Sequence, residues 1–438
     1  MKKKRWAAFL AAGLFLTVGL SGCGVAKEKL SEGGSKENGG ISGDITVITQ
    51  RTDIVDTVFQ DYAKQFQEKY PDVNVSFEAL ADYGGQITPR MNTKDYGDVL
   101  LIPTQIPIAD IPDFFEPLGD LEEMKEKYMG VEERAVNGKV YGIPIAVTYT
   151  GIVYNKKVFA QSGIKEVPKT FDEFKTALKS VKDKTDAIPL YSNYASGWPL
   201  TQWEGAITTV AGNPDYYNIK MPNEDNPFAK GKPHYEMYEL MYDTAKEGLI
   251  EEDPLTTDWE SSKAMMGRGE IATMVLGSWA IDQIKSVADN PDDIGYMPFP
   301  TNAEKVIFPL GADFQIAINK NSKNKEAAQA WVDWFIHESN YSVEQAGGIS
   351  AAKDEPLPEE LKQYEEQGVE FTLLTPAKKG QEGLVDKIDK EAEIGFWLED
   401  NKKVIMEAGI GNRDESYEDL AERFNKAWNE ASKKVMNE

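Results

Sequence analysis

Few side chains in this sequence could carry covalent or metal chemistry. The 438 residues include two histidines, His234 and His337, and a single cysteine, Cys23. This excludes a histidine-rich zinc site, and zinc held by carboxylates alone is uncommon. A Ser-His-Asp triad would need one of the histidines, but no G-x-S-x-G motif accompanies either of them. We therefore expect no cofactor and no bound metal, whereas 73 acidic residues leave a catalytic carboxyl pair possible by counting alone. The expected roles are structural: His337 closes an aromatic helix, and His234 lies in a surface stretch rich in Pro and Tyr.

The polar and aromatic loops of this sequence suit ligand binding rather than catalysis. Residues 50–53 and 103–105 are polar and follow apolar segments with the pattern of strands. Ligands of open α/β sheets lie beyond the carboxyl ends of the strands, so both loops are candidate contacts, although solvent exposure alone would also explain them. Residues 188–203 hold four aromatic side chains without helical or strand periodicity. Some of these aromatic side chains should line a surface or a cleft.

The elements that would position these loops alternate near the start of the chain. Residues 45–48 and 73–77 have the apolar pattern of strands, and residues 55–66 have apolar side chains at helical spacing. Residues 98–103 are apolar on both faces, which is typical of a central parallel strand covered by helices. The order strand–helix–strand–helix–strand predicts an open α/β sheet.

Later segments continue the α/β pattern. Extended stretches are predicted at residues 141–154 and 308–319, and a capping box from Thr170 to Glu173 predicts the start of a helix. Further expected features are a helix capped by Ser322 or Asn324 and broken at Gly347-Gly348, a last helix capped by Ser416, and core positions for Trp331, Trp334 and Trp428.

One glycine motif resembles a nucleotide-binding fingerprint. Gly267-x-Gly269-x-x-Ala272 has the spacing of the dinucleotide loop, but its glycines follow a helix-like segment instead of a strand. We therefore discount nucleotide binding. The glycines should end a helix at 259–266, and a buried strand at 271–276 should deliver Gly277, Ser278 and Trp279 at its carboxyl end.

The first residues have the order of a secretory signal. A basic cluster at 2–5 precedes an apolar run of 14 residues from Ala7 to Leu20, which is too short to span a bilayer. Leu20-Ser21-Gly22-Cys23 resembles the lipobox of bacterial lipoproteins, whose cysteine is acylated and becomes the new N-terminus. The alternative is an ordinary secretory signal. We expect a signal peptide over residues 1–22 and a flexible Gly- and Ser-rich tether over 23–43 that starts at lipidated Cys23.

The composition limits the partners. Removal of the four basic residues of the signal leaves 44 basic and 73 acidic residues, a net charge of −29. Such an acidic chain is a poor partner for nucleic acid, because phosphate binding depends on clustered Lys and Arg. No second apolar run approaches the roughly 20 residues that a membrane-spanning helix needs. The remaining length allows two domains of ordinary size with substantial cores.

Six groups of residues occur in a familiar order along the chain. They are the lipobox with the strand Ile45–Val47, Tyr141–Pro144, Gly151–Lys156, Pro168–Phe174, Gly269–Ala272 with Gly277–Trp279, and Asn321–Ala328. In this order they resemble the extracellular solute-binding proteins of ABC sugar importers, the family 1 type related to maltodextrin-binding proteins. The resemblance implies an α/β, two-lobed periplasmic-binding-protein-like fold of type II, with a hinge and a ligand cleft between the lobes. The implied lobes are residues 44–149 plus 312–352 and residues 150–311 plus 353–438.

The resemblance also implies which residues contact a sugar. Trp279 and Trp397 resemble stacking tryptophans, and the loop that contains Trp198 occupies the place of another stacking platform. Core packing is the alternative role for the first two. The polar candidates are Arg51, Asp53, Gln105 and Asp313, with Tyr83, Tyr149 and Asn193 as further candidates. Arg51 and Asp53 could instead form a plain surface pair.

The implied function is the high-affinity capture of a carbohydrate, a di- or oligosaccharide, and its delivery to an ABC permease by hinge closure. The expected protein is a monomer, lipid-anchored on the extracellular face of the cytoplasmic membrane of a Gram-positive bacterium. Three alternatives remain open: a binding protein for a polyamine or peptide, a secreted carbohydrase, and a sensor coupled to a receptor. A polyamine cleft would place carboxylates between the aromatic residues, and residues 188–203 contain none.

Overall fold

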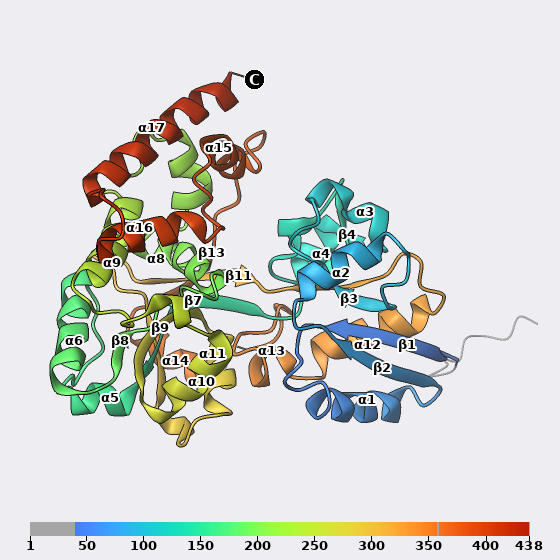
Figure 1. Cartoon of the computed structure of the whole chain (residues 1–438). Helices are drawn as coiled ribbons and strands as arrows, with labels where there is room; N and C mark the ends of the chain where they lie inside the picture. The colour runs from blue at the N-terminus through green and yellow to red at the C-terminus, as the bar shows by residue number, and fades with distance from the viewer. Residues whose placement is uncertain (1–39, 357–358, 438) are drawn as a thin grey trace, which may run out of the picture. The chain divides into compact units, whose positions relative to one another are not determined.

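The computed structural model of the protein describes residues 40–356 and 359–437 (Figure 1). The signal peptide, the lipobox with Cys23 and most of the predicted tether lie outside the described residues. Within the described part, strands and helices alternate along most of the chain. The predicted α/β class is confirmed.

Five strands form the first sheet of the described residues, in the order β2-β1-β3-β12-β6. β1 runs parallel to both of its neighbours, whereas β12 is antiparallel to β3 and β6. β3 is buried on both faces as its apolar sequence predicts, but it is parallel on one side only. The strands are β1 (Gly43–Thr49), β2 (Val73–Ala79), β3 (Val99–Leu101), β6 (Gly142–Pro144) and β12 (Gln315–Ile318).

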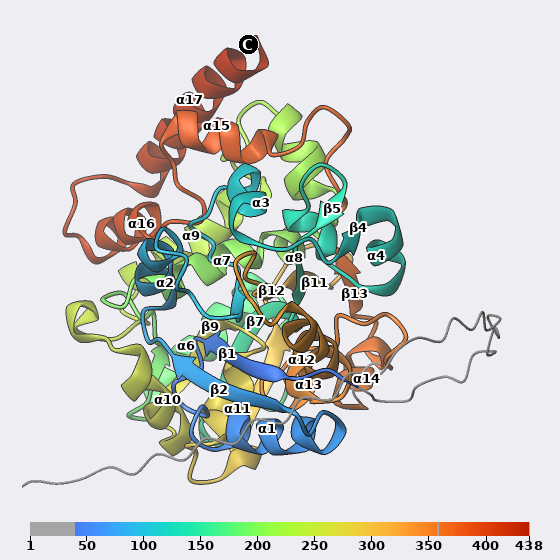
Figure 2. The same cartoon turned by 90° about the vertical axis from the view of Figure 1, so that its right-hand side faces the viewer.

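Helices cover both faces of this sheet. Figures 1 and 2 show α1 and α2 on opposite sides of β1 and β2. The face with α1 has an aromatic core, in which Phe66 of α1 contacts Trp331 of α12 with ring centroids 5.1 Å apart. The predicted core positions of Trp331 and Trp334 are confirmed. The helices are α1 (Val58–Lys69), α2 (Tyr83–Met91), α3 (Ile111–Phe114), α4 (Leu121–Lys127), α12 (Lys325–His337) and α13 (Tyr341–Glu344).

Two helix boundaries in this region differ from the prediction. α1 begins at Val58 instead of residue 55, because the carboxylate of Asp53 binds Arg51 and residues 52–57 form successive turns. α12 ends at His337, ten residues before the glycine pair, because Asn340 adopts a left-handed conformation with φ 55° and starts α13.

The second sheet has the order β13-β11-β7-β9-β8, and β10 pairs with the second half of β7. β9 lies between β7 and β8 and is buried along its whole length, as predicted for residues 271–276. The strands are β7 (Val147–Asn155), β8 (Ile188–Leu190), β9 (Ile271–Gly277), β10 (Ile294–Pro298), β11 (Ile307–Ala312) and β13 (Glu370–Leu373). A separate pair consists of β4 (Gly119–Asp120) and β5 (Lys139–Val140).

The helices around the second sheet begin and end at recognisable signals. The predicted capping boxes at Thr170 and Ser416 are both present, and α10 ends at Gly269, whose φ is 81°. The glycines of the fingerprint-like motif therefore belong to a helix terminus. The helices are α5 (Lys156–Gln161), α6 (Phe171–Lys184), α7 (Gln202–Gly205), α8 (Ile207–Ala211), α9 (Pro233–Lys246), α10 (Trp259–Arg268), α11 (Ala280–Lys285), α14 (Glu359–Glu366), α15 (Leu384–Ala392), α16 (Asp400–Ile410) and α17 (Tyr417–Met436).

The chain passes between the two sheets three times, the last time between β12 and β13, and the first two passages are hydrogen-bonded to each other. It leaves the first sheet after β6 and returns between β11 and β12, so each predicted extended stretch contributes to both sheets. Ile145 donates its amide hydrogen to Phe314 (2.9 Å), and Asp313 donates its own to Ala146 (3.0 Å). These bonds fix the backbone around Asp313.

Candidate functional site

One pocket gathers most of the candidate residues. It has a volume of about 740 Å³, and all its lining residues belong to the compact unit that begins at Gly40. Six of the ten predicted ligand contacts line it: Arg51, Asp53, Tyr83, Trp198, Trp279 and Asp313. Pockets of this size suit small-molecule ligands. The polar and aromatic lining residues come from different elements, which we describe in turn.

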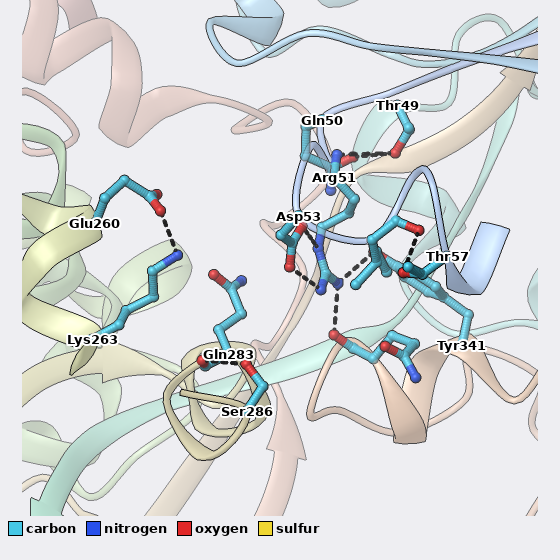
Figure 3. Close-up of polar contacts among 12 residues, drawn as sticks. Thr49, Gln50, Arg51, Asp53, Thr57, Glu260, Lys263, Gln283, Ser286 and Tyr341 are labelled. Carbon is cyan, nitrogen blue, oxygen red and sulfur yellow. Dashed lines mark hydrogen bonds and ion pairs between the residues drawn. The ribbon is translucent and has the colours of Figure 1, made fainter. Parts of the chain in front are cut away.

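A guanidinium–carboxylate pair follows β1 at the carboxyl end of the strand. Arg51 donates from Nε and Nη2 to the two carboxylate oxygens of Asp53, both at 2.8 Å (Figure 3). Its Nη1 donates to the carbonyl of Gln345 (2.7 Å) and to the hydroxyl of Tyr341 (3.3 Å). The predicted surface-pair alternative does not describe Arg51, because its side chain is 9% exposed while that of Asp53 is 41% exposed. The Asp53 carboxylate is thus held in a fixed orientation at the pocket.

Arg51 and Asp53 each favour the ionised form of the other, although burial disfavours both charges. Burial opposes the charge of Arg51, but its hydrogen bonds to Asp53 and Tyr341 hold its pKa above the ordinary value. Burial also opposes ionisation of Asp53, yet the hydrogen bond and charge of Arg51 hold the pKa of Asp53 below the ordinary value. Both groups are therefore charged at neutral pH.

Three tryptophans form a cluster on the pocket wall. The ring centroids of Trp198, Trp259 and Trp279 lie 5.5 to 5.6 Å from one another, with interplanar angles from 45° to 78°. Trp198 is 38% exposed and Trp279 is half-buried, whereas Trp259 is buried but also lines the pocket. Tilted contacts of this kind stabilise aromatic clusters. Such a cluster presents indole faces at fixed angles.

Backbone hydrogen bonds bring the segments of the tryptophan cluster together. The amide of Ala195 donates to the Thr257 hydroxyl (2.6 Å), and that of Trp259 donates to the Ser196 hydroxyl (3.1 Å). Trp279 lies two residues after the end of β9 and packs back on the strand end. A Cβ on Gly277 would lie 2.2 Å from its indole nitrogen, so the absence of a side chain there permits this orientation.

Asp313 lies at the return crossing between the sheets. Its Oδ1 accepts from the amide of Phe314 (2.8 Å). Desolvation raises the pKa of Asp313 to about 6, and the charge of Arg51 only partly opposes this. Tyr83 is bonded to β3 instead of the pocket: its hydroxyl donates to the Leu101 carbonyl (2.8 Å) and accepts from the Leu101 amide (2.7 Å). Tyr83 therefore offers the pocket only its ring.

The structure does not bring the other four candidates to the pocket lining. Gln105 is exposed, and its amide group lies beside Gly84, which does line the pocket. Tyr149 and Asn193 are buried, at 4% and 1% exposure. Trp397 is 52% exposed, and its indole donates to the hydroxyl of Tyr217 (2.9 Å).

Several lining residues were missed by the sequence analysis. They are chiefly polar or aromatic side chains on helices or beside them: Gln202, Trp259, Glu260, Lys263, Gln283, Tyr341 and Gln345. Trp259 had a weak signal, since it is the first residue of the helix predicted at 259–266 and follows the capping residue Asp258. The others are single polar or aromatic residues in helices or at helix ends, and no local pattern in the sequence marks them as pocket residues.

His234 is the clearest error among the sequence predictions. It lies in α9 at 0% exposure, not in a surface stretch. Its Nε2 is 2.8 Å from Glu204 and its Nδ1 is 3.0 Å from the hydroxyl of Tyr216. His337 closes α12 as predicted and contacts the hydroxyl of Tyr128 at 2.8 Å. Both histidines are held by protein groups away from the pocket.

Metal-binding clusters and membrane-spanning helices are both absent from the described residues. Among residues 40–356 and 359–437, no group of three or more His, Cys, Asp or Glu side chains is arranged to hold a metal ion. Within the same residues, no helix combines the length and apolar character needed to cross a membrane.

Comparisons with known proteins agree with the geometry. The family model described as bacterial extracellular solute-binding protein matches residues 52–340. The solved structure of the manno-oligosaccharide-specific solute-binding protein BlMnBP2 from Bifidobacterium animalis subsp. lactis, in complex with mannotriose, is 33% identical with a TM-score of 0.83. The match covers 90% of this chain and 95% of that chain. BlMnBP1 from the same organism, an ABC-transporter binding protein solved with mannobiose, is 35% identical with the same TM-score and coverage.

A relative in a second genus extends the comparison. The diacetylchitobiose-binding protein DasA of Streptomyces coelicolor is 28% identical over 372 residues, which are 80% of this chain and 81% of that protein. The mixed α/β fold of the chain matches these two-lobed binding proteins in its sheets and helices. The chain belongs to the bacterial extracellular solute-binding protein family.

Proposed function

We propose that this protein captures an oligosaccharide outside the cell and delivers it to an ABC import permease. The observation that carries the proposal is the pairing, in one pocket, of a tryptophan cluster with hydrogen-bonding groups that are already oriented. A sugar has apolar C–H faces that pack on aromatic rings, and hydroxyl groups that must keep hydrogen bonds when they leave water. Charged partners give the stronger of these bonds.

The relatives indicate which sugars to try first. The solved relatives bind mannobiose and mannotriose, and the Streptomyces relative is named for diacetylchitobiose. The volume of about 740 Å³ suits a ligand of two or three sugar rings. We therefore propose manno-oligosaccharides of this length as the first substrate class, with chitin-derived sugars second.

We assign roles in sugar binding to six of the pocket residues. Trp198 and Trp279 offer faces for sugar rings, Asp53 and Asp313 accept from hydroxyl groups, and Arg51 orients Asp53. Trp259 supports the other two tryptophans. Contacts through Gln105, Tyr149, Asn193 and Trp397 stay predictions from the family resemblance.

Capture should involve two lobes that close on the sugar. We propose lobes of residues 44–149 plus 312–352 and of 150–311 plus 353–438, joined near the crossings between the sheets. The bonds from Ile145 to Phe314 and from Asp313 to Ala146 place both crossing strands side by side, as a hinge requires. A ligand shifts such an equilibrium only by its greater affinity for the closed form.

Sugar affinity should fall when the pH drops through about 6. The raised pKa of Asp313 means that its carboxylate is largely protonated at pH 5, and a protonated carboxyl loses an acceptor for sugar hydroxyls. Because only the ionised form makes this contact, the dissociation constant should rise about tenfold between pH 7 and pH 5. Calorimetric titrations at both pH values measure this. The Asp313→Asn variant should bind more weakly at pH 7 and show a flat profile, and an equally steep profile in that variant would contradict the assignment.

A thermal-shift panel tests the proposed function. A ligand that binds only the folded state raises the melting temperature, by an amount equivalent to about 2.7 kcal/mol at a hundredfold excess over its dissociation constant. We expect shifts with manno-oligosaccharides or another neutral oligosaccharide and none with spermidine or short peptides. Shifts with polyamines or peptides alone would overturn the substrate class. Release of new reducing ends from a bound sugar would instead reveal a carbohydrase.

We further propose that the protein is a lipid-anchored monomer on the extracellular face of the membrane. The proposal is based on the lipobox-like Leu20–Cys23 and the polar tether after it. Mass spectrometry of the mature protein should find an acylated Cys23 as its first residue. A mature N-terminus at another position, or an unmodified Cys23, would refute the anchor.

A further inference from the structure

Two ion pairs line the pocket from different parts of the fold. Arg51 and Asp53 follow β1 of the first sheet, whereas Glu260 and Lys263 lie on α10, which packs against β9 of the second sheet. Figure 3 shows Lys263 reaching from its helix toward the side of the pocket where Asp53 lies, with Gln283 beside it. The pocket therefore has an ion pair on each side.

Lys263 is poorly compensated by its present partner. Its side chain is 11% exposed, and its ammonium lies 5.3 Å from the ring centroid of Trp259. Its one ion-pair partner among the described residues is Glu260, one helical turn earlier at 2.8 Å, whose side chain is 73% exposed. A partner as exposed as Glu260 contributes little free energy, whereas the mostly buried ammonium of Lys263 needs strong acceptors for its three donors. The ammonium of Lys263 can therefore bind a second carboxylate.

Asp53 is the carboxylate that we expect to accept hydrogen bonds from Lys263. Arg51 occupies one edge of its carboxylate through two hydrogen bonds, yet 41% of the Asp53 side chain remains exposed toward the pocket. The charge of Lys263 already contributes to the lowered pKa of Asp53. In the described structure the two groups are near enough to interact electrostatically, but they do not form an ion pair.

We propose that Lys263 is a positioning residue that pairs with Asp53 when sugar fills the pocket. The alternating charges Arg51, Asp53, Lys263 and Glu260 then form one chain across the pocket. The inference rests on the proposed function, because the sugar supplies the free energy that brings the two sides together. Exclusion of water by the sugar strengthens the attraction between the charges. The pair should therefore slow sugar release more than it speeds sugar binding.

A double-mutant cycle separates this pairing from independent sugar contacts. The variants are Asp53→Asn, Lys263→Met and the double substitution, each titrated with mannotriose at low and at high salt. We expect each single substitution to weaken binding about tenfold, and the double variant to be no weaker than the weaker single one. The coupling between the two sites would then be about tenfold, and it should decrease at high salt.

Two further variants keep the result interpretable. Lys263→Arg retains the charge and should recover most of the affinity, whereas Lys285→Met removes an equal charge from neighbouring α11 outside the pocket lining and should change affinity less than twofold. If the losses of affinity in the two single variants multiply in the double variant, Asp53 and Lys263 act independently. That result would overturn the inference but not the proposed sugar binding. Failure of the unmodified protein to bind any sugar in the thermal-shift panel would overturn the proposed function, and this inference with it.

Discussion

The Trp279→Ala variant is expected to bind oligosaccharide about 30- to 700-fold more weakly than the unmodified protein. Trp279 is half-buried, lies at the pocket and is supported by Trp198 and Trp259 with ring centroids about 5.5 Å away. Truncation of a well-packed tryptophan at the centre of a binding site removes about 2 to 4 kcal/mol, which corresponds to this range of dissociation constants. Isothermal titration calorimetry with mannotriose measures the effect.

A conservative substitution distinguishes lost stacking from a damaged fold. Trp279→Phe keeps a flat apolar face and should recover a large part of the affinity. Both variants should unfold within a few degrees of the unmodified protein when no sugar is present, because Trp279 lies at the pocket surface rather than in a core. Full affinity in Trp279→Ala would show that sugar stacks elsewhere, with the exposed Trp397 as the next candidate.

The Glu204→Gln variant is expected to lose about 3 to 5 kcal/mol of stability. Glu204 is 1% exposed and accepts from the hydroxyl of Tyr238 (2.9 Å), with His234 Nε2 at 2.8 Å and the ammonium of Lys402 at 3.9 Å. Burial alone would raise the pKa of Glu204, but the charges of His234 and Lys402 hold it below the ordinary value. Removal of the carboxylate leaves the buried ammonium of Lys402 without its ion-pair partner, and broken buried pairs cost this much.

Burial and neighbouring charges also act in opposite directions on the pKa of Lys402. Burial lowers its pKa to about 8, although the charges of Glu204 and Asp389 favour the protonated form. Its ammonium also donates to the carbonyl of Phe396. Combining Glu204→Gln with Lys402→Met removes both charges, so the double variant should lose less than the sum of the two single variants.

Urea denaturation at pH 7 checks the prediction about Glu204. The matched control is Glu391→Gln, which removes a carboxylate from an exposed pair with Lys434 (2.6 Å) and should change stability by less than about 1 kcal/mol. Equal midpoints for Glu204→Gln and Glu391→Gln would mean that the buried cluster contributes no more than a surface pair.

Local sequence signals predicted the elements of this fold well. The capping boxes at Thr170 and Ser416, the buried strand β9 and the left-handed Gly269 that ends α10 all depend on neighbouring residues, and all are present. Such features need no tertiary information.

The candidate site was predicted from two kinds of signal. The sheet rule indicated Arg51 and Asp53 after β1, whereas Trp198, Trp279, Asp313 and Tyr83 were indicated by the family resemblance. The sheet rule also indicated Gln105, which does not line the pocket. The roles of Trp259 and Lys263 depend instead on the packing of α10 against a distant loop. The reverse error has the same cause: His234 has polar neighbours in sequence, but α9 turns it toward Glu204.

Calorimetric titration with mannobiose and mannotriose tests most directly whether this pocket captures a sugar. The full chain is titrated in parallel with its Trp279→Ala and Asp313→Asn variants. The account predicts saturable binding of one sugar per chain to the unmodified protein and a marked loss of affinity in both variants. Saturable binding that neither substitution weakens would contradict the assignment of this pocket. The absence of heat with these and all other neutral oligosaccharides would contradict the capture of sugar itself.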